Sequence, residues 1–121
     1  MGNYQNLIGF KKSYELAMAI FEATKTFPKE ERYSLTDQIR RSSRSVCANL
    51  AEAYQRRSYS AHFKSKLHDA LAENAETQVW LQFSKDCGYL PPVVFDVLIK
   101  IQIEIAKLIS YMIVNPEAFL Q

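Results

Sequence analysis

QIRRSSRSVCANLAEA, residues 38–53, is the stretch of this sequence that says most about the fold. It contains no proline or glycine, so it can form one uninterrupted helix. At about 100° per residue, one narrow apolar stripe runs along it and its flanks, made of Leu35, Ile39, Ser43, Val46, Leu50 and Tyr54. The far face carries charged and small side chains. A helix of this kind packs in one bundle and needs a second partner, either another copy of the protein or a polyanion.

The composition favours a single all-α domain, residues 1–121. A chain of 121 residues can bury a sizeable core without disulfides or metal. Apolar residues make up 48% and charged residues 23%, near the average for globular proteins, which excludes a disordered chain. Three glycines and four prolines are too few for the many turns of a β-sandwich, whereas long uninterrupted segments suit helices.

The cysteines and the start of the chain predict a cytoplasmic protein. Cys47 and Cys87 form no CxxC pair, so we expect reduced thiols that pack as small buried hydrophobes. The first residues, MGNYQNLIGFKK, lack the apolar run of a signal peptide. No segment approaches the roughly 18 apolar residues of a membrane span. We therefore expect no membrane contact.

Helix-breaking residues divide the chain into four expected helices, at about 7–26, 35–57, 60–87 and 92–114. The first ends before Pro28, because the residue preceding a proline is pushed out of the helical region. Gly88 ends the third by adopting the left-handed conformation, and Pro91-Pro92 begins the fourth. Short loops make consecutive helices antiparallel, which predicts an up-down-up-down four-helix bundle.

Local side-chain interactions are also expected along these helices. Ser34, with Asp37 three residues later, resembles a capping box at the start of the second helix, and Ser58 or Ser60 can cap the third. Acid-first pairs at i, i+4 each contribute only about 0.3 to 0.5 kcal/mol on an exposed helix. The two pairs in the second helix are Asp37 with Arg41 and Glu52 with Arg56.

The 60–87 helix has apolar side chains on two faces, which predicts a homo-oligomer. Its main stripe consists of Phe63, Leu67, Ala70, Asn74, Thr77 and Leu81. A second patch lies roughly opposite, with Trp80 at its edge, and exposed apolar patches usually mark interfaces. We therefore predict a subunit interface that contains Ala72, Glu76, Val79 and Phe83. The alternative is a monomer whose thick core is completed by aromatic side chains at the helix edges.

Basic residues are concentrated between positions 40 and 66. The net charge of +2 is too small to indicate nucleic-acid binding by itself. Local density matters more, because clustered cations release counterions from a polyanion. The candidate phosphate contacts, opposed within this span by the single acid Glu52, are Arg40, Arg41, Arg44, Arg56, Arg57, Lys64 and Lys66. The alternative is a solvated helix face without a ligand.

No catalytic or metal-binding constellation is expected. His62 and His68 lie on different sides of their helix, and neither belongs to a Glu-x-x-His pair. The acids Glu52, Glu73 and Glu76 are able to bind a cation or perform acid–base chemistry, but pairing with arginine is the simpler role. We therefore predict no enzyme activity, no cofactor and no metal.

Asn74 and Thr77 are polar residues within an apolar stripe. Leaving such a group unpaired in the core costs about 1 to 3 kcal/mol, so both need hydrogen-bond partners. Asn49 or Ser42 at the edge of the second helix are the expected ones. We interpret Asn74 and Thr77 as residues that make the packing between helices specific. The alternative is that they line a ligand pocket.

The segment 27–56, FPKEERYSLTDQIRRSSRSVCANLAEAYQR, resembles the signature of a bacterial four-helix-bundle family named for proteins encoded in intervening sequences of 23S ribosomal RNA genes. The chain departs from the family pattern in three places: the pattern usually has proline at Cys47, glycine at Ala53 and a Gly-Ser-Leu-like triplet at Ala72-Glu73-Asn74. The residues that match its motif are Gln38, Arg40, Arg41, Asn49, Glu52 and Glu76.

This resemblance carries expectations about assembly and partners. A related member, the accessory protein of diversity-generating retroelements, is a ring-shaped pentamer that binds nucleic acid and a reverse transcriptase. The resemblance therefore implies a homopentameric ring and favours RNA or DNA as the ligand of the arginine cluster. It implies no reaction, because a fold alone confers none. The alternative is a scaffold that docks one protein partner. The charges would then only steer that partner during association and keep the protein soluble.

Overall fold

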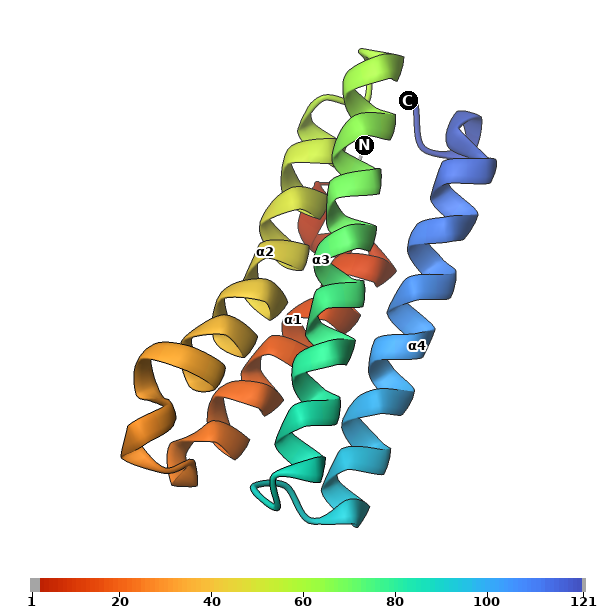
Figure 1. Ribbon diagram of the computed structural model, residues 1–121. Helices are drawn as coiled ribbons and strands as arrows, with labels where there is room; N and C mark the ends of the chain where they lie inside the picture. Colours follow the sequence, from red (N-terminus) through yellow and green to blue (C-terminus); the bar gives the residue numbers. More distant parts are fainter. Residues whose placement is uncertain (1–2, 121) are drawn as a thin grey trace.

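The computed structural model describes residues 3–120, which contain four α-helices and no β-strand. The helices are α1 (Ile8–Ala23), α2 (Asp37–Gln55), α3 (Ser60–Asp86) and α4 (Pro92–Val114). The α1–α2 and α3–α4 connections lie at one end of the molecule, and the α2–α3 connection lies at the other (Figure 1). The predicted all-α fold is confirmed.

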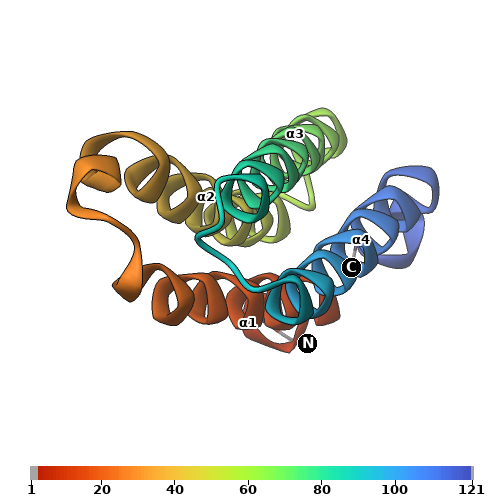
Figure 2. The same cartoon turned by 60° about the horizontal axis from the view of Figure 1, so that its bottom comes forward.

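The helices form two layers, with α2 and α3 over α1 and α4 (Figure 2). Every helix contributes apolar side chains to one continuous core between the layers. Burying each large aliphatic or aromatic side chain contributes about 1.5 to 3 kcal/mol. The predicted main stripe of α3 is buried along its whole length. The largest fully buried apolar side chains are Leu16, Ile20, Ile39, Val46, Leu50, Phe63, Leu67, Leu81, Ile105 and Ile109.

The start of α2 differs from the expected capping box. A five-residue π-helical turn, Arg32–Thr36, leads into α2, and Thr36 already has helical dihedral angles, φ −59° and ψ −49°. Because the backbone is helical upstream of α2, no side chain is required as a cap. Ser34 Oγ donates instead to Glu31 Oε1 at 2.7 Å. The predicted cap at Ser34 is therefore wrong.

The predicted serine cap of α3 is also wrong. Tyr59 occupies the N-cap position and makes no side-chain hydrogen bond to the helix, while Ser60 is already the first helical residue. At the other end of α3 the prediction is confirmed, because Gly88 has φ +79°. Its N–H donates to the Lys85 carbonyl at 2.9 Å. Pro92 then begins α4, as expected.

The two cysteines have different environments. Cys47 is buried, and its Sγ donates to Ser13 Oγ at 3.4 Å between α2 and α1. Cys87 is exposed, contrary to the prediction of a buried hydrophobe, because it follows the last residue of α3 in the turn before Gly88. Within residues 3–120, no helix combines the length and the hydropathy needed to cross a membrane.

Candidate functional site

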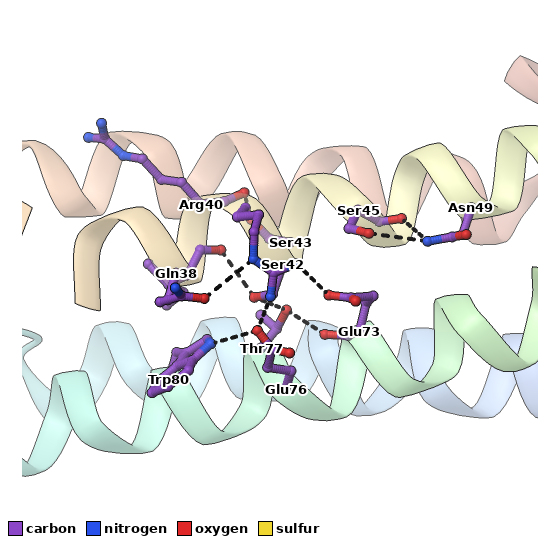
Figure 3. A network of polar contacts seen from close by, with 12 residues as sticks. Gln38, Arg40, Ser42, Ser43, Ser45, Asn49, Glu73, Glu76, Thr77 and Trp80 are labelled. Atoms are coloured by element: carbon purple, nitrogen blue, oxygen red, sulfur yellow. Dashed lines mark hydrogen bonds and ion pairs between the residues drawn. The ribbon is translucent and has the colours of Figure 1, made fainter. Parts of the chain in front are cut away.

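Arg41 reaches from α2 to two glutamates of α3. Its Nη1 donates to Glu73 Oε1 at 3.1 Å, and its Nη2 donates to Glu76 Oε2. Trp80 Nε1 donates to the same Glu76 oxygen at 3.1 Å, and Arg41 Nε donates to Gln38 Oε1 at 3.3 Å. Figure 3 shows this network in the space between the two helices. Three of the six motif residues, Gln38, Arg41 and Glu76, therefore lie together.

The charges of this network do not favour an additional phosphate. Burial acts to lower the pKa of Arg41, but attraction to Glu73 and hydrogen bonds to both carboxylates outweigh it and raise the pKa. One guanidinium faces two carboxylates, so the local charge is −1. A phosphate would have to displace charge-assisted hydrogen bonds that already exist. The structure thus separates Arg41 from the other predicted phosphate contacts.

Both ion pairs predicted within α2 are replaced by pairs between helices. Arg41 contacts Glu73 and Glu76 rather than Asp37, and Glu52 Oε2 lies 3.1 Å from Lys66 Nζ rather than pairing with Arg56. Partners on the neighbouring helix therefore compete with those one turn away on α2. A sequence pattern along a single helix cannot show this competition.

A pair of buried hydroxyl groups lies beneath the Arg41 network. Ser42 Oγ and Thr77 Oγ1 are 2.8 Å apart and hydrogen-bonded, and both residues are fully buried. Thr77 Oγ1 also donates to the Glu73 carbonyl at 2.9 Å. Ser42 is therefore confirmed as the partner of Thr77. This contact favours one register of α2 against α3, since a shift would break the hydrogen bond between the helices and leave each hydroxyl group only a carbonyl of its own helix, Ile39 or Glu73.

Asn74 bonds to α4 rather than to Asn49. Its Nδ2 donates to the Gln102 carbonyl at 3.0 Å, and Gln102 Nε2 donates to the Asn74 carbonyl at 3.2 Å. Asn49 Nδ2 instead donates to the Ser45 carbonyl of its own helix at 2.9 Å. Sequence reasoning missed Gln102. The signal was present, because Gln102 is a polar residue surrounded by isoleucines in a strongly apolar helix.

Three cations surround Phe21 on the other side of α2. Arg40 Cζ lies 4.9 Å and Arg44 Cζ 5.8 Å from the centre of the Phe21 ring, and Lys25 Nζ lies 5.0 Å from it. Arg40 Nε also donates to Thr24 Oγ1 at 2.8 Å, which holds its side chain against α1. In Figure 3, Arg40 points away from the Glu73–Glu76 network. We call Lys25, Arg40 and Arg44 the Phe21 cluster.

The remaining predicted phosphate contacts lie toward the opposite end of α2 and on α3. Arg56 and Lys64 are exposed. Arg57 stacks over the Tyr54 ring at 4.1 Å, and its Nη1 donates to the Tyr54 carbonyl at 2.8 Å. Lys66 is paired with an acid, as described above. At 1.5 Å per residue, Arg56 is about 24 Å along α2 from Arg40, so the seven residues do not form one compact site.

The outward face of α3 carries the apolar residues predicted for a subunit interface. Val79 is 49% exposed and Phe83 is 52% exposed, and Ala72 is exposed beside them. The Phe83 ring lies 6.0 Å from the Trp80 ring. These two rings border a groove of about 690 Å³ between α3 and the start of α2, lined by Glu31, Ser34, Leu35, Gln38, Arg41, Glu76, Trp80, Phe83 and Cys87.

One carboxylate at the rim of this groove accepts two hydrogen bonds. Ser34 Oγ donates to Glu31 Oε1 at 2.7 Å, and Tyr89 Oη donates to Glu31 Oε2 at 2.8 Å. These bonds lower the pKa of Glu31 below its ordinary value, mainly through Ser34. The hydrogen bond to Glu31 raises the pKa of Tyr89 to about 12. The contact joins the segment before α2 to the turn after α3.

The described part of the chain contains no cluster of three metal-ligating side chains. His62 and His68 are both exposed on α3. The three acids considered as cation ligands, Glu52, Glu73 and Glu76, each form an ion pair with a basic residue.

Comparison with known proteins gives a family and a structural relative. None of the curated proteins compared with this chain matches it significantly. A crystal structure of a protein of unknown function from the S23 ribosomal protein family of Bacteroides thetaiotaomicron is 33% identical, with a TM-score of 0.79, over 88% of this chain and 95% of that one. The family model of the 23S rRNA-intervening sequence protein matches residues 5–111. This chain therefore belongs to the 23S rRNA-intervening sequence protein family.

Proposed function

We propose that the protein is a cytoplasmic, non-enzymatic homo-oligomer that binds the phosphates of RNA or DNA through a basic surface. The observation that carries the proposal is the Phe21 cluster. Among residues 3–120, neither Arg40 nor Arg44 forms an ion pair with a carboxylate. Such cations release counterions when they contact a polyanion, which favours binding at low salt.

The cluster narrows the set of phosphate contacts predicted from the sequence. The excess charge of the cluster is that of Arg40 and Arg44, because Lys25 contacts Glu22 at 3.1 Å. Arg41 has a structural role between α2 and α3. Arg56 and Lys64 remain candidates for contacts to a longer polynucleotide, since both are exposed.

A charge-reversal experiment tests this surface. The variant R40E/R44E changes the net charge by −4, and K100E/K107E on exposed positions of α4 is its matched control. We expect R40E/R44E to weaken binding of fluorescently labelled RNA and DNA by more than about 100-fold and to flatten its salt dependence. The control should change affinity only slightly. Equal losses in the two variants would mean that total charge, and not this surface, determines binding.

We propose that the subunits are up-down-up-down bundles that assemble into a pentameric ring through the outward face of α3. The exposed Val79 and Phe83, with Ala72 and Glu76 beside them, support this interface. Size-exclusion chromatography with light scattering tests it. The variant V79E/F83E should reduce the mass to that of a smaller species, whereas V93E/V97E, at exposed positions of α4, should not. A monomeric wild-type protein would contradict the assembly.

A protein-docking scaffold is the second candidate function. The groove beside Trp80 and Phe83 supports it, because aromatic side chains at a groove are typical of protein interfaces. An assembled wild-type protein without affinity for RNA or DNA at low salt would favour this function. Nucleic acid that copurifies with the protein and dissociates at high salt would favour the first.

A further inference from the structure

A row of aromatic side chains continues from the Phe21 cluster along α1. The Phe10 and Tyr14 rings lie 6.1 Å apart at an interplanar angle of 30°, and Tyr4 meets Phe10 edge-on at 5.0 Å. Tyr14 is 56% exposed, and Tyr4 and Phe10 are half-buried. Phe10 packs against the edge of the core, whereas more than half of Tyr14 is exposed, so burial does not explain the Tyr14 ring on this face.

The aromatic row borders a groove between α1 and α2. The groove has a volume of about 460 Å³ and is lined by Tyr4, Phe10, Tyr14, Ala17, Met18, Arg44, Cys47, Ala48 and Ala51. Small side chains form the α2 wall, so the rings are not covered from that side. Arg44 belongs both to this groove and to the Phe21 cluster. The apolar groove and the cations are therefore one continuous surface.

The dimensions of this surface suit a short polymer. Phe10, Tyr14 and Phe21 follow one another at spacings of four and seven residues on one side of α1. At 1.5 Å per residue, Phe10 and Phe21 are about 16 Å apart along the helix. That length accommodates a few nucleotides, with rings at one end and cations at the other.

We propose that this face binds single-stranded nucleic acid, with bases stacked on Tyr14 and Phe10 and phosphates bound by Arg40, Arg44 and Lys25. This inference rests on the proposed binding of RNA or DNA and adds the type of strand and the site. An exposed ring offers stacking to any base that is free of its complement, whereas the bases of a duplex are already stacked. A site made only for duplex phosphates does not need the rings.

The charges around the rings favour an anionic ligand. Glu15, on the same helix, pairs with Lys12, which also contacts Glu104 of α4 at 3.6 Å and so lies on the α4 side. Glu22 is balanced by Lys25 at 3.1 Å. The excess charge on the face is that of Arg40 and Arg44, and it is positive.

Tyr14 provides a direct test with a closely matched control. Tyr111 on α4 is also 56% exposed, so Y14A and Y111A remove the same amount of exposed ring. The probes are a fluorescently labelled 12-nucleotide single strand of thymidines, the same length of uridines, and a 12-base-pair DNA duplex. We expect the wild type to prefer the single strands. Y14A should weaken single-strand binding about tenfold and leave duplex binding unchanged, and Y111A should change neither.

A conservative variant tests the role of the ring, and cross-linking locates the strand. Tyr14→Trp retains a stacking surface and should preserve single-strand affinity. A preserved affinity would show that Y14A acts by removing the ring. Ultraviolet cross-linking to the thymidine strand followed by peptide mapping should place the adduct in the segment 4–18. An adduct confined to α3 or α4 would overturn the proposal.

The outcomes separate this inference from the proposed function. If no probe binds at low salt, both fail. If single strand and duplex bind equally, Y14A has no effect and R40E/R44E abolishes binding, the proposed function stands and the single-strand site is wrong. If Y14A instead changes the oligomeric mass, a second copy of the chain covers this face, and the site is again wrong.

Discussion

The two sides of α2 show how differently two adjacent arginines can be used. Arg40 points toward α1, where it lies over Phe21 with two other cations and bonds to Thr24. Arg41, rotated by about 100°, points toward α3, where it contacts Glu73 and Glu76. The α3 side has a local charge of −1 and serves packing. The α1 side retains its positive charge and is the candidate ligand surface.

This difference shows that the number of basic residues in a segment does not define a binding surface. Seven basic residues lie between positions 40 and 66, yet ion pairs between helices neutralise Arg41 and Lys66. What decides the role of each cation is which helix lies opposite it. Three predictions test the contrast between the two sides of α2.

The largest expected effect on stability is on the α3 side. Thr77→Val keeps the shape of the side chain but leaves the buried Ser42 hydroxyl without its closest partner. We expect a loss of about 1 to 2 kcal/mol in the free energy of unfolding, measured by urea denaturation. The control on the α1 side is Thr24→Val. It should cost less, because the partner that Thr24 loses is the half-buried Arg40 side chain rather than a fully buried hydroxyl group. Equal losses of unfolding free energy in T77V and T24V would contradict the proposed difference between the two sides of α2.

The double variant S42A/T77V refines this test. It removes both hydroxyl groups, so no buried group is orphaned, and it should recover part of the stability lost in T77V. A double variant less stable than T77V by the full cost of a cavity would show that packing, and not the hydrogen bond, dominates this contact.

Neutralising Arg41 and Arg40 one at a time should have opposite effects: the first mainly on stability, the second mainly on nucleic-acid affinity. R41Q removes the partner of two carboxylates and should cost about 1 kcal/mol of stability, with little effect on nucleic-acid affinity. R40Q should cost less stability but weaken RNA or DNA binding about tenfold. The slope of log affinity against log salt concentration should also fall by about 0.7 for a single strand. Denaturation and fluorescence anisotropy measure the two effects. A stronger loss of affinity in R41Q than in R40Q would show that Arg41, and not Arg40, contacts the nucleic acid.

The smallest expected effect is a pH dependence at the rim of the α3 groove. The folded protein lowers the pKa of Glu31, so the contribution of this carboxylate to stability is present at neutral pH. It is lost as the pH falls from the ordinary value of 4.5 through the lower folded pKa. Tyr89 has a raised pKa, so its contribution is lost as the pH rises from 10.0 to about 12.

Tyr89→Phe removes the hydrogen bond to Glu31 and is the variant that tests this pair. We expect slightly weaker pH dependence of the unfolding midpoint in both ranges, measured by circular dichroism. The α1-side variant T24V is the control, because it should leave both ranges unchanged. A pH profile of Y89F identical to that of the wild type would show that the Tyr89–Glu31 contact makes no measurable contribution.

Helix positions and buried stripes were predictable from the sequence, whereas local capping was not. Pro92 begins α4 and Gly88 ends α3, as expected. Proline restricts the backbone and glycine frees it in any tertiary context. Ser34 does not cap, because the backbone around it is already helical, and Ser60 does not, because it is the first helical residue and Tyr59 occupies the N-cap position. A residue with a capping preference cannot cap a helix that begins at or before its own position.

The candidate site was predicted only in part. The composition of the Arg40 to Arg44 segment indicated α2 as the helix of the candidate site, which stays a prediction. The spacing of Val79 and Phe83 identified an exposed apolar face on α3. Phe21 and Lys25 were not assigned to the basic site, because they lie on a different helix and become neighbours of Arg40 only when α1 packs on α2.

The sequence alone determined that this chain forms four helices and which stripe of α3 is buried, since both follow from backbone restrictions and from a period of 3.6 residues. It also determined the family, whose model matches residues 5–111. Only the tertiary structure decided which charges are neutralised and which remain available to a ligand. The physical reason is that an ion pair depends on the distance between atoms of different helices, and the packing of the whole core sets that distance.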